Sequence, residues 1–162
     1  MQGPAIKVQE IETEVNTRAL LAGAQFSDAY SIEIDNARLD ARRAAEKMLG
    51  RGPRWIEALL RLRNRLVTPF GLKTPAPGET ARPGSIGIFP VLSETPDRLV
   101  AGLDDHHLDF RVVIDVAACG NGQRVTATTL VLTHNLLGRF YLAIILPFHR
   151  LIVRSLLRQI AA

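Results

Sequence analysis

The sequence predicts one α+β domain in which an antiparallel sheet packs on a long C-terminal helix, with two shorter helices after the first strand. Three observations predict it. The segment from about His107 to Ala117 alternates apolar and polar residues, as a strand with one buried face does. Strand-like segments precede and follow it across hairpin-like turns. From about Leu136 onward the chain is apolar and carries arginines at helical spacing.

The composition fits one domain of ordinary size. With 162 residues, of which 47% are hydrophobic and 22% charged, the chain can bury a core without disulfides or metals. Its one cysteine, Cys119, excludes an intrachain disulfide. We expect residues 1–25 to be an N-terminal extension and residues 26–162 to form the domain. The formal net charge of +4 comes mostly from arginine and permits anionic partners.

A short strand comes first. Apolar residues alternate with polar ones across residues 30–34, and the turn-prone pair Asp35 and Asn36 follows. A helix should come next, because Asp40 is a suitable N-cap and Gly50 a suitable stop. Its apolar stripe comprises Ala44, Ala45, Met48 and Leu49.

A second helix should begin at Pro53, where the missing amide hydrogen costs little. Apolar residues recur in it at helical spacing: Trp55, Leu59, Leu62 and Leu66. Prolines and glycines are dense between Thr68 and Gly84, so we expect a loop there.

The remaining strands form a meander. A strand near residues 86–91 passes through Pro90 and should therefore lie at a sheet edge or a bulge. Residues 99–103 form the next strand and residues 104–106 its turn. After the long strand, Asn121 and Gly122 are typical of a type I′ hairpin turn, and residues 125–133 return. In the terminal helix, Pro147 should produce a kink.

The long strand should have one buried and one hydrated face. Apolar residues share the first: Leu108, Phe110, Val112, Ile114 and Val116. The charged residues Asp109, Arg111 and Asp115 share the second.

Several short motifs are recognisable between about Phe26 and Ala162. They are Arg54-Trp55, Phe70-Gly71-Leu72, Phe89-Pro90-Val91, Gly102-Leu103-Asp104-Asp105, His107-Leu108-Asp109-Phe110-Arg111, His134-Asn135, Gly138-Arg139 with Tyr141, and Pro147-Phe148-His149. In these the chain resembles an uncharacterised bacterial domain family allied to the START-like, or SRPBCC, helix-grip superfamily. The resemblance implies a curved sheet that grips the C-terminal helix and leaves an apolar ligand cavity between them. Members of the superfamily carry lipids, sterols, polyketides or plant hormones, and a minority are cyclases or dehydratases.

The resemblance predicts a domain that binds an apolar or amphipathic small molecule, such as a lipid or a polyketide. Aromatic side chains are the candidates to line the cavity: Trp55, Phe70, Phe89, Phe110, Tyr141 and Phe148. Tyr141 is the favoured polar contact, since a buried phenol requires a hydrogen-bond partner. The same aromatic residues could instead fill the core.

Two alternatives stay open. The first is an enzyme of the cyclase, dehydratase or isomerase type, with His134 or His149 as general base and Tyr141 or Arg111 as orienting group. No motif marks a catalytic residue, and either histidine could be structural. The second is a ligand-free partner domain of a separately encoded oxidoreductase, because some relatives follow a nucleotide-binding domain. The chain has no G-x-G-x-x-G motif, so NAD(P) binding is not expected.

We expect neither a metal nor another cofactor. Carboxylates and imidazoles concentrate between Asp104 and Asp109, but a turn accounts for the aspartates and no zinc motif is present. Nucleic-acid binding is not expected, because the arginines are dispersed and no aromatic stacking platform accompanies them.

The arginines of the terminal helix most simply form a solvated outer face, and a peripheral contact with an anionic membrane is the alternative. Arg150, Arg154 and Arg158 recur at helical spacing, opposite the apolar residues Ile152, Val153, Leu156 and Leu157. The uncharged run 140–148 is shorter than the roughly 20 residues that cross a bilayer. The acidic N-terminal segment does not fit a secretory signal, so we expect a cytoplasmic location.

Overall fold

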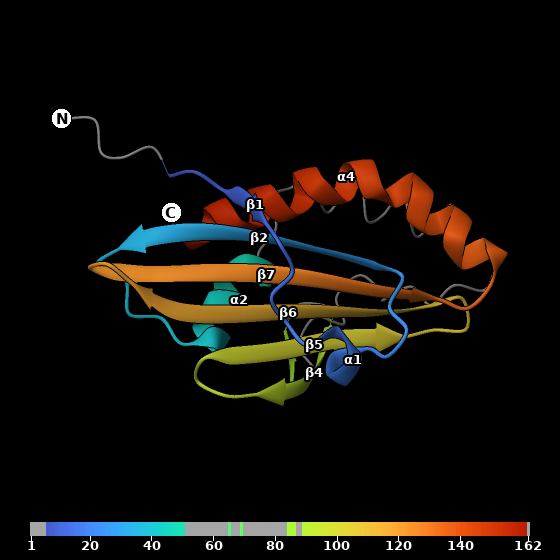
Figure 1. The fold of residues 1–162 in the computed structure, drawn as a ribbon, viewed down its shortest axis with the longest axis horizontal. Helices are drawn as coiled ribbons and strands as arrows, with labels where there is room; N and C mark the ends of the chain where they lie inside the picture. The colour runs from blue at the N-terminus through green and yellow to red at the C-terminus, as the bar shows by residue number, and fades with distance from the viewer. Residues whose placement is uncertain (1–5, 51–64, 66–68, 70–83, 87–88, 162) are drawn as a thin grey trace.

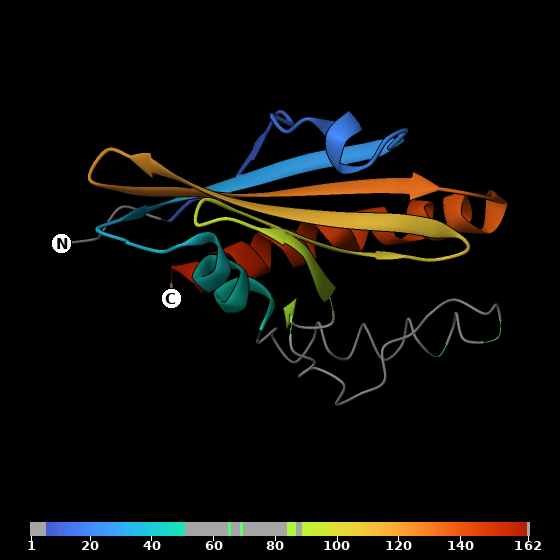
Figure 2. The same cartoon turned by 90° about the horizontal axis from the view of Figure 1, so that it is seen from below.

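The computed structural model describes residues 6–50, 65, 69, 84–86 and 89–161. They form a curved, seven-stranded antiparallel sheet with a long C-terminal helix across one face, so the predicted α+β class is confirmed (Figures 1 and 2). Trp55, Phe70, the helix predicted from Pro53 and most of the loop predicted between Thr68 and Gly84 lie outside the described residues.

The first long strand, β2, pairs with β7, which is the last strand in the sequence. The sheet order is β1-β2-β7-β6-β5-β4-β3, and every neighbouring pair is antiparallel. The strands are β1 (Gln9–Ile11), β2 (Phe26–Asp35), β3 (Ser85–Ile86), β4 (Phe89–Glu94), β5 (Arg98–Asp104), β6 (Leu108–Cys119) and β7 (Gly122–Thr133). The helices within the described residues are α1 (Thr17–Leu20), α2 (Ala41–Leu49) and α4 (Leu136–Ile160).

One face of the sheet, the inner face, forms the main core with α2 and α4. Paired residues on neighbouring strands point to the same face, and Tyr30, Ala127, Ile114 and Leu99 form one such row across the sheet. None of the four is more than 1% exposed. The helical residues that pack into this core are Ala41, Ala44, Ala45 and Met48 of α2 and Val153, Leu156, Leu157 and Ile160 of α4.

The opposite face is not simply hydrated, as the alternation in the long strand predicted. Val113 shares that face with Asp109 and Arg111, yet it is fully buried. It belongs to a second core whose other buried members are Val15, Leu21, Val100 and Leu130. The segment before β2, which was expected only as an extension, supplies Val15 and Leu21 to this core, and its strand β1 pairs with β2.

The β6–β7 hairpin turns one residue earlier than predicted. Cys119 pairs with Gly122, so Gly120 and Asn121 form the turn. Of these two, Gly120 alone has a positive φ, +55°, whereas a type I′ turn requires it at both residues. The predicted turn type is therefore wrong. Gly122 serves another purpose, because a Cβ atom there would come within 1.9 Å of the carbonyl oxygen of Ile34 on β2.

The terminal helix is confirmed, with its boundaries set by local chemistry. The Asn135 side chain caps α4 by accepting a hydrogen bond from the Gly138 amide at 2.9 Å. Pro147 lies inside the helix, which follows an arched path in Figure 1. Pro147 and Ala143 are both exposed, so water can bond the carbonyl that proline leaves unpaired.

α4 is also the one helix within the described ranges that is long and apolar enough to cross a membrane by length and composition. Its mean hydropathy reaches 1.6 over an 18-residue window, of which 11% is buried. A core helix of a soluble protein can meet the same criterion, although such a helix is mostly buried.

Candidate functional site

A small polar cluster interrupts the apolar interface between the sheet and α4. It comprises Asp28 and Tyr30 on β2 and His149 on α4, and we call it the β2–α4 cluster. His149 Nε2 lies 3.2 Å from Asp28 Oδ1 and 3.1 Å from Oδ2. The two side chains are only 14% and 8% exposed, respectively. The cluster therefore places a carboxylate and an imidazole in contact, largely away from water.

Strand alternation and helix packing together position these side chains. Asp28 and Tyr30 are two residues apart on β2, so both point toward the inner face. Thr129 on β7 pairs with Asp28 and is buried beside it. The Phe26 ring meets the His149 imidazole edge-on, with 6.0 Å between the ring centroids. The imidazole is thus held between an aromatic ring and a carboxylate.

Two buried atoms of the cluster have no hydrogen-bond partner within the part of the chain that the structure describes. They are Asp28 Oδ2 and Tyr30 Oη. Asp28 Oδ2 lies 3.1 Å from His149 Nε2, but a hydrogen on that nitrogen can point well at only one of the two carboxylate oxygens. Leaving a buried polar atom unpaired costs about 1–3 kcal/mol, so native structures rarely do it. Both atoms can therefore bond a molecule that enters the interface.

Burial governs the protonation of Tyr30. It raises the pKa of the phenol above 10.0, and the negative charges of Asp28 and Glu10 raise it further, while Arg150 and Arg154 oppose the shift. The Arg154 guanidinium carbon lies 5.5 Å from the centre of the Tyr30 ring. The phenol is therefore neutral near pH 7, where it can both donate and accept a hydrogen bond.

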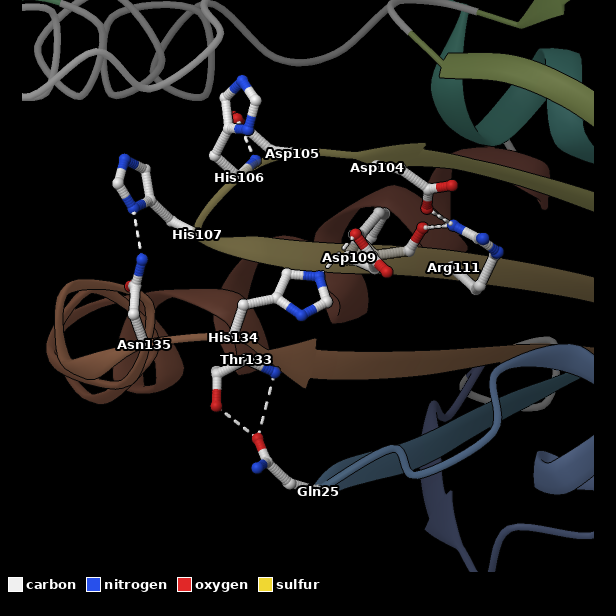
Figure 3. Close-up of polar contacts among 11 residues, drawn as sticks. Gln25, Asp104, Asp105, His106, His107, Asp109, Arg111, Thr133, His134 and Asn135 are labelled. Atoms are coloured by element: carbon white, nitrogen blue, oxygen red, sulfur yellow. Dashed lines mark hydrogen bonds and ion pairs between the residues drawn. The ribbon is translucent and has the colours of Figure 1, made fainter.

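His134, the other candidate base, lies at the other polar site, where the β5–β6 turn meets the start of α4. Figure 3 shows His134 pointing toward Asp109, with 3.0 Å between Nε2 and Oδ1. The imidazole is 38% exposed, and Asp109 is on the opposite face of β6 from the inner-face residues. The structure does not bring His134 to the β2–α4 cluster.

The contacts around this turn hold the strands to the helix. His107 Nδ1 lies 2.9 Å from the side-chain nitrogen Nδ2 of Asn135 (Figure 3). The backbone carbonyl of His107 accepts a hydrogen bond from the backbone amide of His134 at 2.9 Å. Arg111 donates to Asp104 at 2.6 Å and to the Phe110 carbonyl at 2.9 Å. Across the described ranges, no group of three or more His, Cys, Asp or Glu side chains could hold a metal ion. These contacts are those of a structural junction.

A further contact anchors the end of β7 beside this junction. Gln25 Oε1 accepts hydrogen bonds from the backbone amide of Thr133, at 3.0 Å, and from the Thr133 hydroxyl (Figure 3). Gln25 immediately precedes β2, so these bonds hold the start of β2 against the end of β7.

The predicted lining residues do not all gather at the interface. The Phe89 and Phe110 rings contact each other, with 5.2 Å between centroids, and pack against the main core. Tyr141 is half-buried on α4. Phe148 is 46% exposed and lies on the outward side of α4, so it does not line the sheet–helix interface. Arg111 belongs to the junction described above.

Sequence reasoning missed Asp28 and Tyr30 as site residues. A signal was present, because Asp28 shares the parity of Tyr30, Ile32 and Ile34 in the first strand. A carboxylate at a position that should face the core requires a buried partner. His149 supplies that partner.

Comparisons with known proteins identify a family. No curated protein sequence matches this chain. A similar solved structure is that of CalU16 from Micromonospora echinospora, which is 13% identical and aligns over 98% of this chain and 92% of that chain, with a TM-score of 0.31. A family described as "Protein of unknown function (DUF2867)" matches residues 20–156. The chain therefore belongs to the DUF2867 family.

Proposed function

We propose that this chain is a binding domain for a small amphipathic molecule, held between the inner face of the sheet and α4. The observation that carries the proposal is the β2–α4 cluster, in which Asp28 Oδ2 and Tyr30 Oη are buried and without hydrogen-bond partners among the described residues. Ligand sites are mainly apolar with a few converging polar groups, which matches this composition.

The architecture supports a helix-grip arrangement for such a site. α4 runs along the sheet and packs its buried residues onto the face formed by β2 and β7. β2 pairs with β7, so the first and last long strands form one continuous surface beneath the helix. A molecule between these elements would contact apolar side chains along most of its length and the cluster at one point.

The cluster favours a ligand with a hydroxyl group at its polar end. A carboxylate oxygen such as Asp28 Oδ2 accepts hydrogen bonds, and the neutral Tyr30 phenol can donate one. A hydroxyl can satisfy both atoms, because it donates once and accepts twice. Asp28 and Tyr30 are two residues apart on one strand, so their Cα atoms are about 7 Å apart and both side chains point to the same face of the sheet.

Two measurements test this proposal. Native mass spectrometry of the protein purified from its own host, followed by organic extraction, should show a co-purified amphipathic molecule. A fluorescently labelled long-chain alcohol and its methyl ether then serve as probes. We expect the alcohol to bind more tightly, because the ether cannot donate to Asp28, and Asp28→Asn to remove most of that preference.

The control variant is His134→Gln, which changes a histidine outside the cluster and should leave probe binding unchanged. Urea unfolding of each variant checks that the fold is retained. If the alcohol and the ether bind equally to the wild type, or Asp28→Asn keeps the preference for the alcohol, the proposed role of the cluster is wrong.

The same cluster favours one second candidate, an enzyme of the isomerase, cyclase or dehydratase type. The contact between Asp28 and His149 Nε2 is the kind that orients a general base, and it leaves Nδ1 to exchange a proton with a substrate. The test is turnover of the co-purified molecule as a function of pH. His149→Gln should abolish turnover while the protein remains folded, and His134→Gln should not. Turnover that survives His149→Gln would exclude this mechanism.

A further inference from the structure

Large apolar side chains lie exposed along the outward face of α4. They are Leu136, Phe140, Ile144, Phe148 and Leu151, with exposed fractions between 46% and 79%. Their spacing of four, four, four and three residues places them on one face of the helix. We call this face the outer stripe. Most exposed apolar residues in proteins are scattered singly, whereas a continuous row indicates an interaction surface.

The charges beside the outer stripe have one sign. α4 contains no aspartate or glutamate. Arg139 lies three residues after Leu136, and Arg154 lies three residues after Leu151, so exposed arginines border both ends of the stripe. Arg150 and Arg158 are exposed as well.

The stripe differs from the apolar face that the sequence pattern indicated. Val153, Leu156 and Leu157 were expected to form the apolar side of an amphipathic helix end. They are buried against the sheet and α2 and are unavailable to a partner. The available apolar surface is on the other side of the helix and mainly in its first two-thirds.

We propose that the outer stripe docks on the surface of an anionic lipid bilayer. Its apolar side chains would enter the boundary between headgroups and acyl chains, and the arginines would contact lipid phosphates. Charge complementarity favours this occupant over a second copy of the chain, since pairing two such helices would bring arginines together. The helix lies on the membrane and does not cross it, because Val153, Leu156 and Leu157 hold it to the sheet. This inference does not depend on the β2–α4 cluster.

Vesicle flotation tests the proposal with the full chain. One set of vesicles contains phosphatidylcholine alone, and the other contains phosphatidylcholine with one third phosphatidylglycerol. The stripe variant carries Phe140→Gln and Ile144→Gln, which alter exposed positions and retain good helix formers. The matched control is Leu92→Gln, because Leu92 on β4 is also an exposed apolar residue, at 52%.

We expect the wild type to bind the anionic vesicles and to be released by salt. The stripe variant should bind at least about tenfold more weakly, because two large apolar side chains no longer enter the bilayer, and Leu92→Gln should bind normally. A variant with Arg139→Gln and Arg150→Gln should lose the preference for phosphatidylglycerol. Circular dichroism and urea unfolding verify the fold of each variant.

Three results would overturn the proposal. The first is a failure of the wild type to bind anionic vesicles. The second is equal binding by the stripe variant and the Leu92→Gln control. The third is self-association in sedimentation velocity that the stripe variant abolishes, without vesicle binding, which would assign the stripe to a second copy of the chain.

Discussion

The imidazole of His149 and the carboxylate of Asp28 meet at 3.1–3.2 Å although they are 121 positions apart in the sequence. The contact joins the last helix to the first long strand within an apolar interface. Each group is the other's main compensation for the loss of water.

A double-mutant cycle measures that compensation. His149→Leu alone should lower the free energy of unfolding by about 3 kcal/mol, because Asp28 then stays buried without its partner. Replacing both residues, with Asp28→Val and His149→Leu, should recover most of the loss, since neither member of the pair is then left buried without its partner. Urea unfolding gives the four free energies. A double variant as unstable as the sum of the single variants would show that the two side chains act independently.

Tyr30→Phe should stabilise the ligand-free protein. It removes a buried hydroxyl that has no hydrogen-bond partner among the described residues, and we expect a gain of about 1 kcal/mol. The same variant should lose affinity for the alcohol probe, so stability and binding would change in opposite directions. Urea unfolding and probe titration, run on the same preparations, measure both. A loss of stability would mean that the hydroxyl is paired in solution.

The pH dependence of Tyr30→Phe gives an independent check. The folded-state pKa of Tyr30 lies above 10.0, so the unfolded chain releases this proton first as pH rises. The part of the folding free energy that depends on a neutral Tyr30 is fully present below pH 10. It is lost as pH rises from there through the folded-state pKa. The wild type should therefore lose more stability than Tyr30→Phe above pH 10, which urea unfolding across that range would detect.

Gly138→Ala should destabilise the protein, although alanine forms helices better than glycine. A Cβ atom at position 138 would lie 2.1 Å from the carbonyl oxygen of His107, so the start of α4 would have to move away from the β5–β6 turn. We expect a cost of about 1–3 kcal/mol in urea unfolding, as for other overpacked sites. Helix propensity alone predicts a gain of about 1 kcal/mol, so the sign of the change decides between the two.

Leu21→Ala tests whether the N-terminal segment belongs to the folded unit. Leu21 is 7% exposed and packs in the second core with Val113 and Leu130. We expect a loss of about 2 kcal/mol, at the lower end for buried leucines because the site lies near the surface. Ile6→Ala is the matched control, since Ile6 is 52% exposed in the same segment. Equal effects of the two substitutions would indicate that the segment does not pack on the sheet in solution.

The periodicity of the sequence predicts most of the fold because each long strand has one strongly apolar face. The alternation in β6 and the helical pattern in α4 are long enough to indicate both type and position. Local capping chemistry is equally readable, since Asp40 accepts a hydrogen bond from the Arg43 amide at 2.8 Å, as expected of an N-cap.

Contacts between distant segments are what the sequence could not show. Nothing near Val113 in the chain indicates that Val15 and Leu21 cover it, because that contact depends on the path of the N-terminal segment. The predicted position of the β6–β7 turn is wrong for a related reason. Position 122 requires glycine because its backbone lies close to Ile34 on β2, and β2 is not part of the β6–β7 hairpin. Likewise, the pattern around Asp28 gives its face but not its partner on α4.

The pairing of β2 with β7 has a consequence for how the protein folds. β3, β4, β5, β6 and β7 can form from neighbouring hairpins, but β2 must wait for β7, about a hundred residues later in synthesis. Until α4 is synthesised, the part of the apolar inner face that α4 covers stays exposed. A nascent chain paused before residue 136 would therefore present a long sheet whose inner face is covered by α2 at β5 and β6 but lacks α4 over β2 and β7. Exposed apolar surface of this kind is what chaperones recognise.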